Sequence, residues 1–150
     1  MWGGCAGGVG RVRGDRSARD SPAGWAGRAL RAFDEWGAER IVAERNFGGA
    51  LVESTLRSVR AQAPVRLVTA PRGKAARAEP VAALYELGRV IHHGRFTALE
   101  DQLCHFSVSG YRGSRSPDRA DAMVWGLSDL MLNGTGGVAS WNSAGFSFAR

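Results

Sequence analysis

The chain has 150 residues, and its balance of 44% hydrophobic and 23% charged residues predicts one globular domain with a buried core. No run of about 18 apolar residues exists, which excludes a transmembrane helix, and no signal peptide is visible, so we expect a cytosolic protein without membrane contact. The net charge is +6 and Lys74 is the only lysine. Arginine binds phosphate oxygens bidentately, which favours a polyanionic partner, although a GC-rich genome explains the same bias.

The first half of the chain predicts a helix and two short strands after an irregular start. Five of the first ten residues are glycine, so we expect residues 1–14 to be poorly ordered. Ser21 and Pro22 are typical of a helix opening, with Ser21 as the N-cap. The apolar run 41–43 predicts a buried strand that ends in Glu44 and is followed by a Gly-Gly turn. A helix over about 49–60 and a strand over 65–69 come next.

The second half continues this alternation. A loop over 70–74 opens a helix over 76–87, a third strand covers 89–92, and a helix spans 96–106. Residues 107–115 predict a polar loop, and Ser116 and Pro117 repeat the helix opening for a last helix that runs to about 132. Residues 133–150 are rich in Gly and Ser and predict a frayed tail. Strands that alternate with helices indicate an α/β layered domain with a largely parallel sheet.

Apolar positions in these elements define the predicted core. Helical spacing places two stripes inward: Trp25, Ala29, Phe33 and Trp36 in the first helix, and Ala120, Met123, Val124, Leu127 and Met131 in the last. We also expect burial of Ile41, Val42, Leu67, Val68 and Val90 in the strands.

Three carboxylates are the candidates for chemistry. Glu44 ends a strand, and ligands of open α/β sheets lie outside the carboxyl ends of strands. Asp118 and Asp121 are three residues apart at a helix start, so both project on one side. Clustered carboxylates favour Mg²⁺ or Mn²⁺, and two such ions can activate water for phosphodiester cleavage. The alternatives are a Glu44 that only leaves its strand into solvent and an Asp118 that is only stabilised by the helix dipole.

Basic residues and histidines offer further candidates. Arg72, Lys74 and Arg77 form a basic loop after the second strand, where phosphate contact and simple solvation are both open. The chain's three histidines, His92, His93 and His105, could act as a general base, bind phosphate or be structural. No Walker motif and no GxSxG elbow is present, which argues against ATP hydrolysis and acyl transfer. Cys5 and Cys104 lack zinc-site spacing.

Three collinear blocks between Asp15 and Met131 carry a resemblance to a known family: IVAERNFGGALV, APRGKAARAEPVAALYELGRVIHHGRFTALEDQL and SPDRADAMVWGLSDLM. They resemble the carboxyl-terminal nuclease domain of large terminase subunits from phages, prophages and gene transfer agents. The resemblance implies a ribonuclease H-like fold and cleavage of double-stranded DNA with two divalent ions during genome packaging. It puts metal-binding carboxylates on Glu44 and Asp121, with Asp118 as a third or accessory ligand. It also implies the portal protein and the small terminase subunit as partners.

The sequence departs from this family's pattern in two ways. The family's domain begins with a hairpin whose first strand carries another metal-binding Asp, and residues 1–14 show no such strand; Asp15 resembles a later position. The family's packaging ATPase is also absent. We therefore expect an amino-terminally truncated nuclease-like domain over 15–132 with an incomplete metal site.

Three functions remain open at this point. The first is a terminase-type nuclease domain that binds duplex DNA in a salt-sensitive way but cleaves it little or not at all in Mg²⁺ and at best in traces in Mn²⁺. The second is a non-catalytic DNA-binding or portal-docking remnant. The third is an unrelated, metal-independent α/β protein.

Overall fold

The computed structural model describes residues 1–45, 49–70, 72–107 and 109–133, and the chain divides into two compact units. Unit 1 comprises Met1–Asp15 and the chain from Arg72 onward, and unit 2 comprises Arg16–Pro71. Within the described residues, no helix is long and apolar enough to cross a membrane. The tail predicted over 133–150 lies outside the described residues except for Asn133, and so does Gly48 of the predicted Gly-Gly turn.

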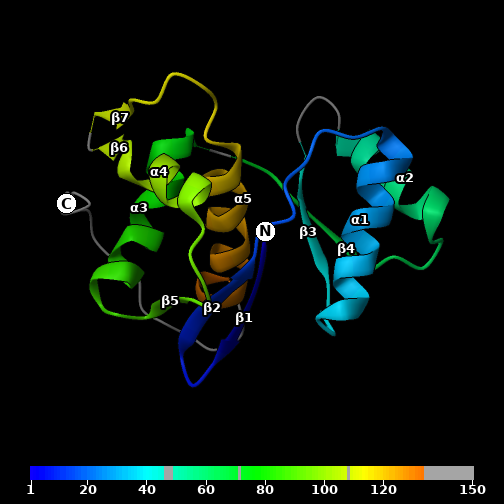
Figure 1. The fold of residues 1–150 in the computed structure, drawn as a ribbon, viewed down its shortest axis with the longest axis horizontal. Coiled ribbons are helices and arrows are strands. Elements are labelled where there is room, and N and C mark those ends of the chain that lie inside the picture. The colour runs from blue at the N-terminus through cyan, green and yellow to red at the C-terminus, as the bar shows by residue number, and fades with distance from the viewer. Residues whose placement is uncertain (46–48, 71, 108, 134–150) are drawn as a thin grey trace. The chain divides into compact units, whose positions relative to one another are not determined.

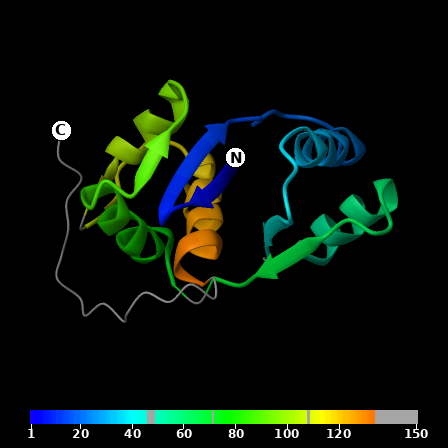
Figure 2. The same cartoon turned by 90° about the horizontal axis from the view of Figure 1, so that it is seen from below.

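Unit 1 is built on a mixed three-stranded sheet. Strands β1 (Trp2–Ala6) and β2 (Val9–Gly14) pair antiparallel, and β2 pairs parallel with β5 (Val90–His92). Three helices belong to this unit: α3 (Lys74–Glu86), α4 (Thr97–Cys104) and α5 (Asp118–Leu127). Helix α5 contacts α3, α4 and β1 (Figures 1 and 2).

The β1–β2 hairpin corrects two expectations, namely that residues 1–14 are poorly ordered and that they contain no strand. The two residues of its turn, Gly7 and Gly8, have φ of 58° and 74°, and type I′ hairpin turns require positive φ at both central positions. Two of the five glycines that made the segment look irregular therefore form its turn. Val12 of β2 is 1% exposed. Strand β2 also pairs with β5, and Gly10, for example, is in register with Val90.

The core of unit 1 confirms the apolar stripe predicted for the last helix. All five residues of that stripe are buried together with residues of β2, α3, β5 and α4; the other members of this core are Val12, Ala78, Val81, Leu84, Val90, Leu99, Leu103 and Phe106. Two details differ from the sequence prediction. The last helix becomes a π-helix, η1 (Ser128–Leu132), after Leu127. The expected polar loop contains two short antiparallel strands, β6 (Phe106–Ser107) and β7 (Gly110–Tyr111).

Unit 2 contains two helices and a parallel pair of strands (Figure 1). Helices α1 (Pro22–Glu35) and α2 (Gly49–Val59) contact each other, and α2 contacts both β3 (Ile41–Glu44) and β4 (Val65–Val68). The N-cap prediction for α1 is confirmed, because the Ser21 hydroxyl accepts a hydrogen bond from Gly24 N at 3.2 Å. The buried centre of this unit is small and consists of Ala26, Leu30, Leu56 and Ala63.

Two core predictions fail in unit 2. The strand residues Ile41, Val42, Leu67 and Val68 are half-buried rather than buried, because β3 and β4 form a sheet of only two strands within the described residues. The four residues of the first-helix stripe, which ends at the C-cap Trp36, are also half-buried, although Trp25 and Ala29 pack against the buried cluster. The fully buried positions are Ala26, Leu30 and Ala32, so small and aliphatic side chains face the interior and the aromatic rings lie at its edge.

Candidate metal centre

The site begins at the first turn of α5, whose backbone amides are capped from outside the helix. The N-cap position is Pro117, which offers no capping side chain, so the Ser-Pro opening predicted here does not cap as it does in α1. Instead, Gln102 of α4 accepts hydrogen bonds through Oε1 from Arg119 N and Ala120 N, each at 3.0 Å. Arg119 Nε also donates to Asp15 Oδ2 at 2.8 Å. Helix α4 and the end of β2 thus position this turn.

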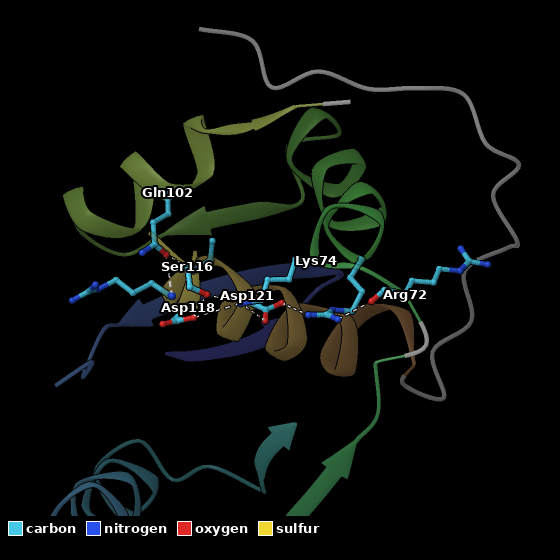
Figure 3. Close-up of polar contacts among 9 residues, drawn as sticks. Arg72, Lys74, Gln102, Ser116, Asp118 and Asp121 are labelled. Carbon is cyan, nitrogen blue, oxygen red and sulfur yellow. Dashed lines mark hydrogen bonds and ion pairs between the residues drawn. The ribbon is translucent and has the colours of Figure 1, made fainter. Parts of the chain in front are cut away.

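Asp118 and Asp121 lie together on one side of this turn, as their spacing predicts, and both face Lys74 of α3 (Figure 3). Lys74 Nζ is 3.4 Å from Asp118 Oδ1 and 3.5 Å from Asp121 Oδ2. Its shortest contact is a hydrogen bond of 2.9 Å to the hydroxyl of Ser116. That hydroxyl donates to Asp118 Oδ1 at 2.5 Å. One ammonium group therefore bridges the two carboxylates and the serine.

Arg77 binds the other oxygen of Asp121 in a buried ion pair. Its Nη2 donates to Asp121 Oδ1 at 2.6 Å, and the two side chains are only 10% and 8% exposed. A buried carboxylate needs such compensation, because transfer of an unpaired charge out of water is costly. Two further contacts fix the guanidinium: Nη1 donates to the carbonyl of Arg72 at 2.8 Å, and the group lies 4.8 Å from the centre of the Trp125 ring.

The three basic residues that the sequence grouped as DNA contacts occupy different environments. Arg72 is exposed, and its side chain points away from the carboxylates (Figure 3). Lys74 is partly exposed beside Asp118, and Arg77 is a buried ion-pair partner. One pattern in the sequence is consistent with this arrangement, namely the equal spacing of the two basic and the two acidic residues. Lys74 and Arg77 are three residues apart on α3, as are Asp118 and Asp121 on α5, so two cations on one helix face two anions on the other.

Glu44 is the last residue of β3, in register with Val68 of β4, and its side chain is half-buried. This confirms its predicted place at a strand's carboxyl end. Glu44 belongs to unit 2 and the two aspartates to unit 1. A shared metal site of Glu44 with Asp121 therefore stays a prediction.

The chemistry of the two aspartates fits a hard divalent cation. Mg²⁺ and Mn²⁺ prefer carboxylate oxygens, and both aspartates already direct an oxygen at the same positive charge, Lys74. The number of ligands is small. No group of three or more His, Cys, Asp or Glu side chains that could hold a metal occurs in the part of the chain that the structure describes. The candidate ligands in unit 1 are thus two carboxylates, both from the first turn of α5.

A second polar cluster surrounds His92, and the sequence did not predict it. The Tyr85 hydroxyl lies 2.5 Å from His92 Nε2, and Glu100 Oε1 lies 3.3 Å from Nδ1. The backbone N–H of Phe96 hydrogen-bonds to the Glu100 carboxylate, and this bond, aided by His92, lowers the pKa of Glu100. Burial raises the pKa of Tyr85. These contacts link α3, β5 and α4, which indicates a structural role for His92.

The other two histidines contact neighbouring groups outside this cluster. His93 Nε2 lies 2.9 Å from Arg11 Nη1, and His105 Nδ1 lies 2.6 Å from the carbonyl of Asp101. Among the contacts of the described residues, neither histidine touches Asp118 or Asp121. The geometry thus gives none of the three imidazoles a place beside the acidic pair.

Comparison with known proteins gives one finding. A family model with the description "Terminase RNaseH-like domain" matches residues 5–130, which include the β1–β2 hairpin from Cys5, all of unit 2 and α5. Neither the curated proteins nor the solved structures contain a match to the chain.

Proposed function

This chain belongs to the terminase RNaseH-like domain family, and from this membership we propose that it cleaves double-stranded DNA with the help of divalent cations. The family fits the observed α/β architecture, in which a mixed sheet is flanked by helices, and it excludes an unrelated α/β protein. The role is therefore of the terminase nuclease type.

The observation that carries the proposal is the pairing of Asp118 and Asp121 around one positive charge at the start of α5. Helix dipoles favour carboxylates in this first turn, but a dipole alone does not explain why Asp121 is buried with a cation at each of its oxygens. An arrangement in which two carboxylates share one partly exposed ammonium group suits a site for cations.

In this proposal Asp118, Asp121 and Glu44 hold Mg²⁺ or Mn²⁺. A bound divalent ion supplies activation of water and stabilisation of the charge that develops on the leaving oxygen. Arg77 acts on Asp121, because its buried ion pair orients that carboxylate. Arg72 is exposed and is the clearest candidate of the basic loop for a phosphate contact, with the partly exposed Lys74 next to it.

The wider setting of this activity also belongs to the proposal. We place the chain in genome packaging of a phage, a prophage or a gene transfer agent, in the bacterial cytoplasm. Its partners there would be duplex DNA, the portal protein and the small terminase subunit. DNA binding should fall steeply with salt, because phosphate contacts release counterions.

The test uses supercoiled plasmid with purified protein, in Mg²⁺, in Mn²⁺ and in EDTA. Because few acidic ligands are present, we expect weak nicking in Mn²⁺ and little in Mg²⁺. Asp121→Asn, Asp118→Asn and Glu44→Gln should each reduce nicking, whereas Glu79→Gln, which alters an exposed carboxylate on α3, should not. Nicking that persists in EDTA, or that is unchanged in Asp121→Asn, would overturn the proposal.

The rival function is a non-catalytic DNA-binding or portal-docking remnant. The observation that favours it is that both aspartates already form ion pairs with Lys74 or Arg77, and such pairs compete with metal binding. The same experiment separates the two functions. Salt-sensitive retention of duplex DNA without any metal-dependent nicking would support the remnant.

A further inference from the structure

We propose that the Lys74 ammonium is a built-in counter-cation of the Asp118–Asp121 pair, which a divalent ion must displace before both carboxylates can bind it. This inference rests on the proposed function and adds a residue that controls metal affinity. It concerns Lys74 itself, which the sequence suggested only as a DNA contact.

The position of Lys74 in its own helix is the first argument. Lys74 is the first residue of α3, and no acidic residue occupies the first turn of that helix. A cation at a helix N-terminus is unfavourable, because the macrodipole and the unpaired backbone N–H groups already place positive charge there. The local structure of α3 therefore gives no reason for a lysine. The compensating negative charge comes from α5, through Asp118 and Asp121.

The second argument is the contrast between the two cations at the site. Arg77 is 10% exposed, and an ion pair, a carbonyl and an aromatic ring hold it in place. Lys74 is 36% exposed, and its distances of 3.4 and 3.5 Å to the carboxylates are longer than those of charge-assisted hydrogen bonds. Its shortest contact among the described residues is to the neutral hydroxyl of Ser116. Arg77 is thus the fixed partner of Asp121, and Lys74 is the cation that can leave.

The third argument is electrostatic. Lys74 Nζ lies between oxygens of both aspartates, which is where their combined negative potential attracts a cation most strongly. A divalent ion that binds these oxygens meets a positive charge already there, and the repulsion lowers its affinity. Removal of that charge should therefore tighten metal binding, whereas removal of a neighbouring exposed charge should not.

The main experiment measures Mn²⁺ binding to the whole chain by isothermal titration calorimetry, without DNA. Lys74→Gln is compared with the matched control Arg72→Gln, which removes one positive charge from the same loop at an exposed position. We expect Lys74→Gln to bind Mn²⁺ about threefold to tenfold more tightly than Arg72→Gln. This is the effect of one partly solvent-screened charge on a doubly charged ion. High salt should shrink the difference.

A second measurement leaves Lys74 itself in place, because it is the only lysine and can be labelled selectively. Reductive methylation with ¹³C-formaldehyde keeps the positive charge and labels Lys74 and the amino terminus alone. In a Mg²⁺ titration followed by NMR, the Lys74 signal should shift and saturate in the wild type and stay constant in Asp121→Asn. A Lys74 signal that does not move at saturating Mg²⁺ would overturn the counter-cation role.

The outcomes separate this inference from the proposed function. If Asp121→Asn leaves Mn²⁺ binding unchanged, or if none of the proteins binds Mn²⁺, the proposed metal site is wrong, and Lys74 loses its role with it. If Asp121→Asn abolishes binding and Lys74→Gln binds no more tightly than Arg72→Gln, the metal site stands and the counter-cation role alone is wrong.

Discussion

The substitution Gly10→Ala tests whether the β1–β2 hairpin packs on the last helix as the structure shows. A Cβ added at Gly10 would lie 2.5 Å from Met131 Sδ and 2.8 Å from Leu127 Cδ2. Both distances are shorter than any non-bonded contact that a Cβ atom makes with sulfur or carbon, so Gly10→Ala forces these side chains to move. Such overpacking costs about 1–3 kcal/mol in a well-packed core. Since the two atoms are the ends of flexible side chains, we expect a value in the lower half of this range.

A matched control removes the other effects of the added methyl group. Gly4 lies on the partner strand of the same hairpin, and a Cβ there meets no atom within 4 Å. Both substitutions reduce the conformational entropy of the unfolded chain, which stabilises the fold by about 0.4–1 kcal/mol. This gain cancels in the comparison. Gly10→Ala should therefore be less stable than Gly4→Ala by about 1–2 kcal/mol, as measured by urea unfolding followed by far-UV circular dichroism.

A third variant identifies the atoms responsible. In a Met131→Ala background the nearest clashing atom is gone, so Gly10→Ala should cost less than it does in the wild type. Equal stabilities of Gly10→Ala and Gly4→Ala would refute the reasoning, because they would mean that β2 does not lie against α5 and η1.

Three further predictions concern the stability of unit 1. Leu127→Ala should lose about 2–5 kcal/mol of unfolding free energy, because the side chain is 2% exposed in the core; a loss below about 1 kcal/mol would contradict the predicted phase of the helix. Gln102→Ala should cost about 1 kcal/mol, because it removes the cap of α5, whereas Gln102→Glu keeps the acceptor and should cost less; equal losses would argue against capping. The hydrogen bond from Phe96 N and the contact with His92 lower the pKa of Glu100, so its stabilisation is present above the ordinary pKa of a glutamate and is lost as the pH falls through the lowered value. Stability should therefore fall more steeply in acid for the wild type than for Glu100→Gln, and parallel curves would count against this prediction.

The ion pairs of the acidic site affect how its variants are interpreted. Asp121 is both a proposed metal ligand and the buried partner of Arg77, so Asp121→Ala removes a ligand and leaves a buried guanidinium uncompensated. Loss of nicking in that variant could then report unfolding of the site. Asp121→Asn keeps the shape and an acceptor oxygen for Arg77, and for this reason it is the variant used in the tests above.

The sequence by itself determined the features that depend on neighbours along the chain. The helical period placed Asp118 and Asp121 on one side of α5 and the five apolar residues of α5 and η1 in the core, because positions three and four apart share a face in any helix. The strand that ends in Glu44 followed from a short apolar run, and the cap at Ser21 from its position before Pro22. These features need only local backbone geometry.

Only the tertiary structure decided the features that depend on contacts between distant segments. In the glycine-rich start, β2 pairs with β5, and Gly10 lies close to Leu127 and Met131. The cap of α5 comes from Gln102 on another helix, and the cations that bind its aspartates come from α3, 44 residues earlier. Such partners are set by the packing of whole helices and strands, whereas a pattern in the sequence records only which face of each element is apolar or charged.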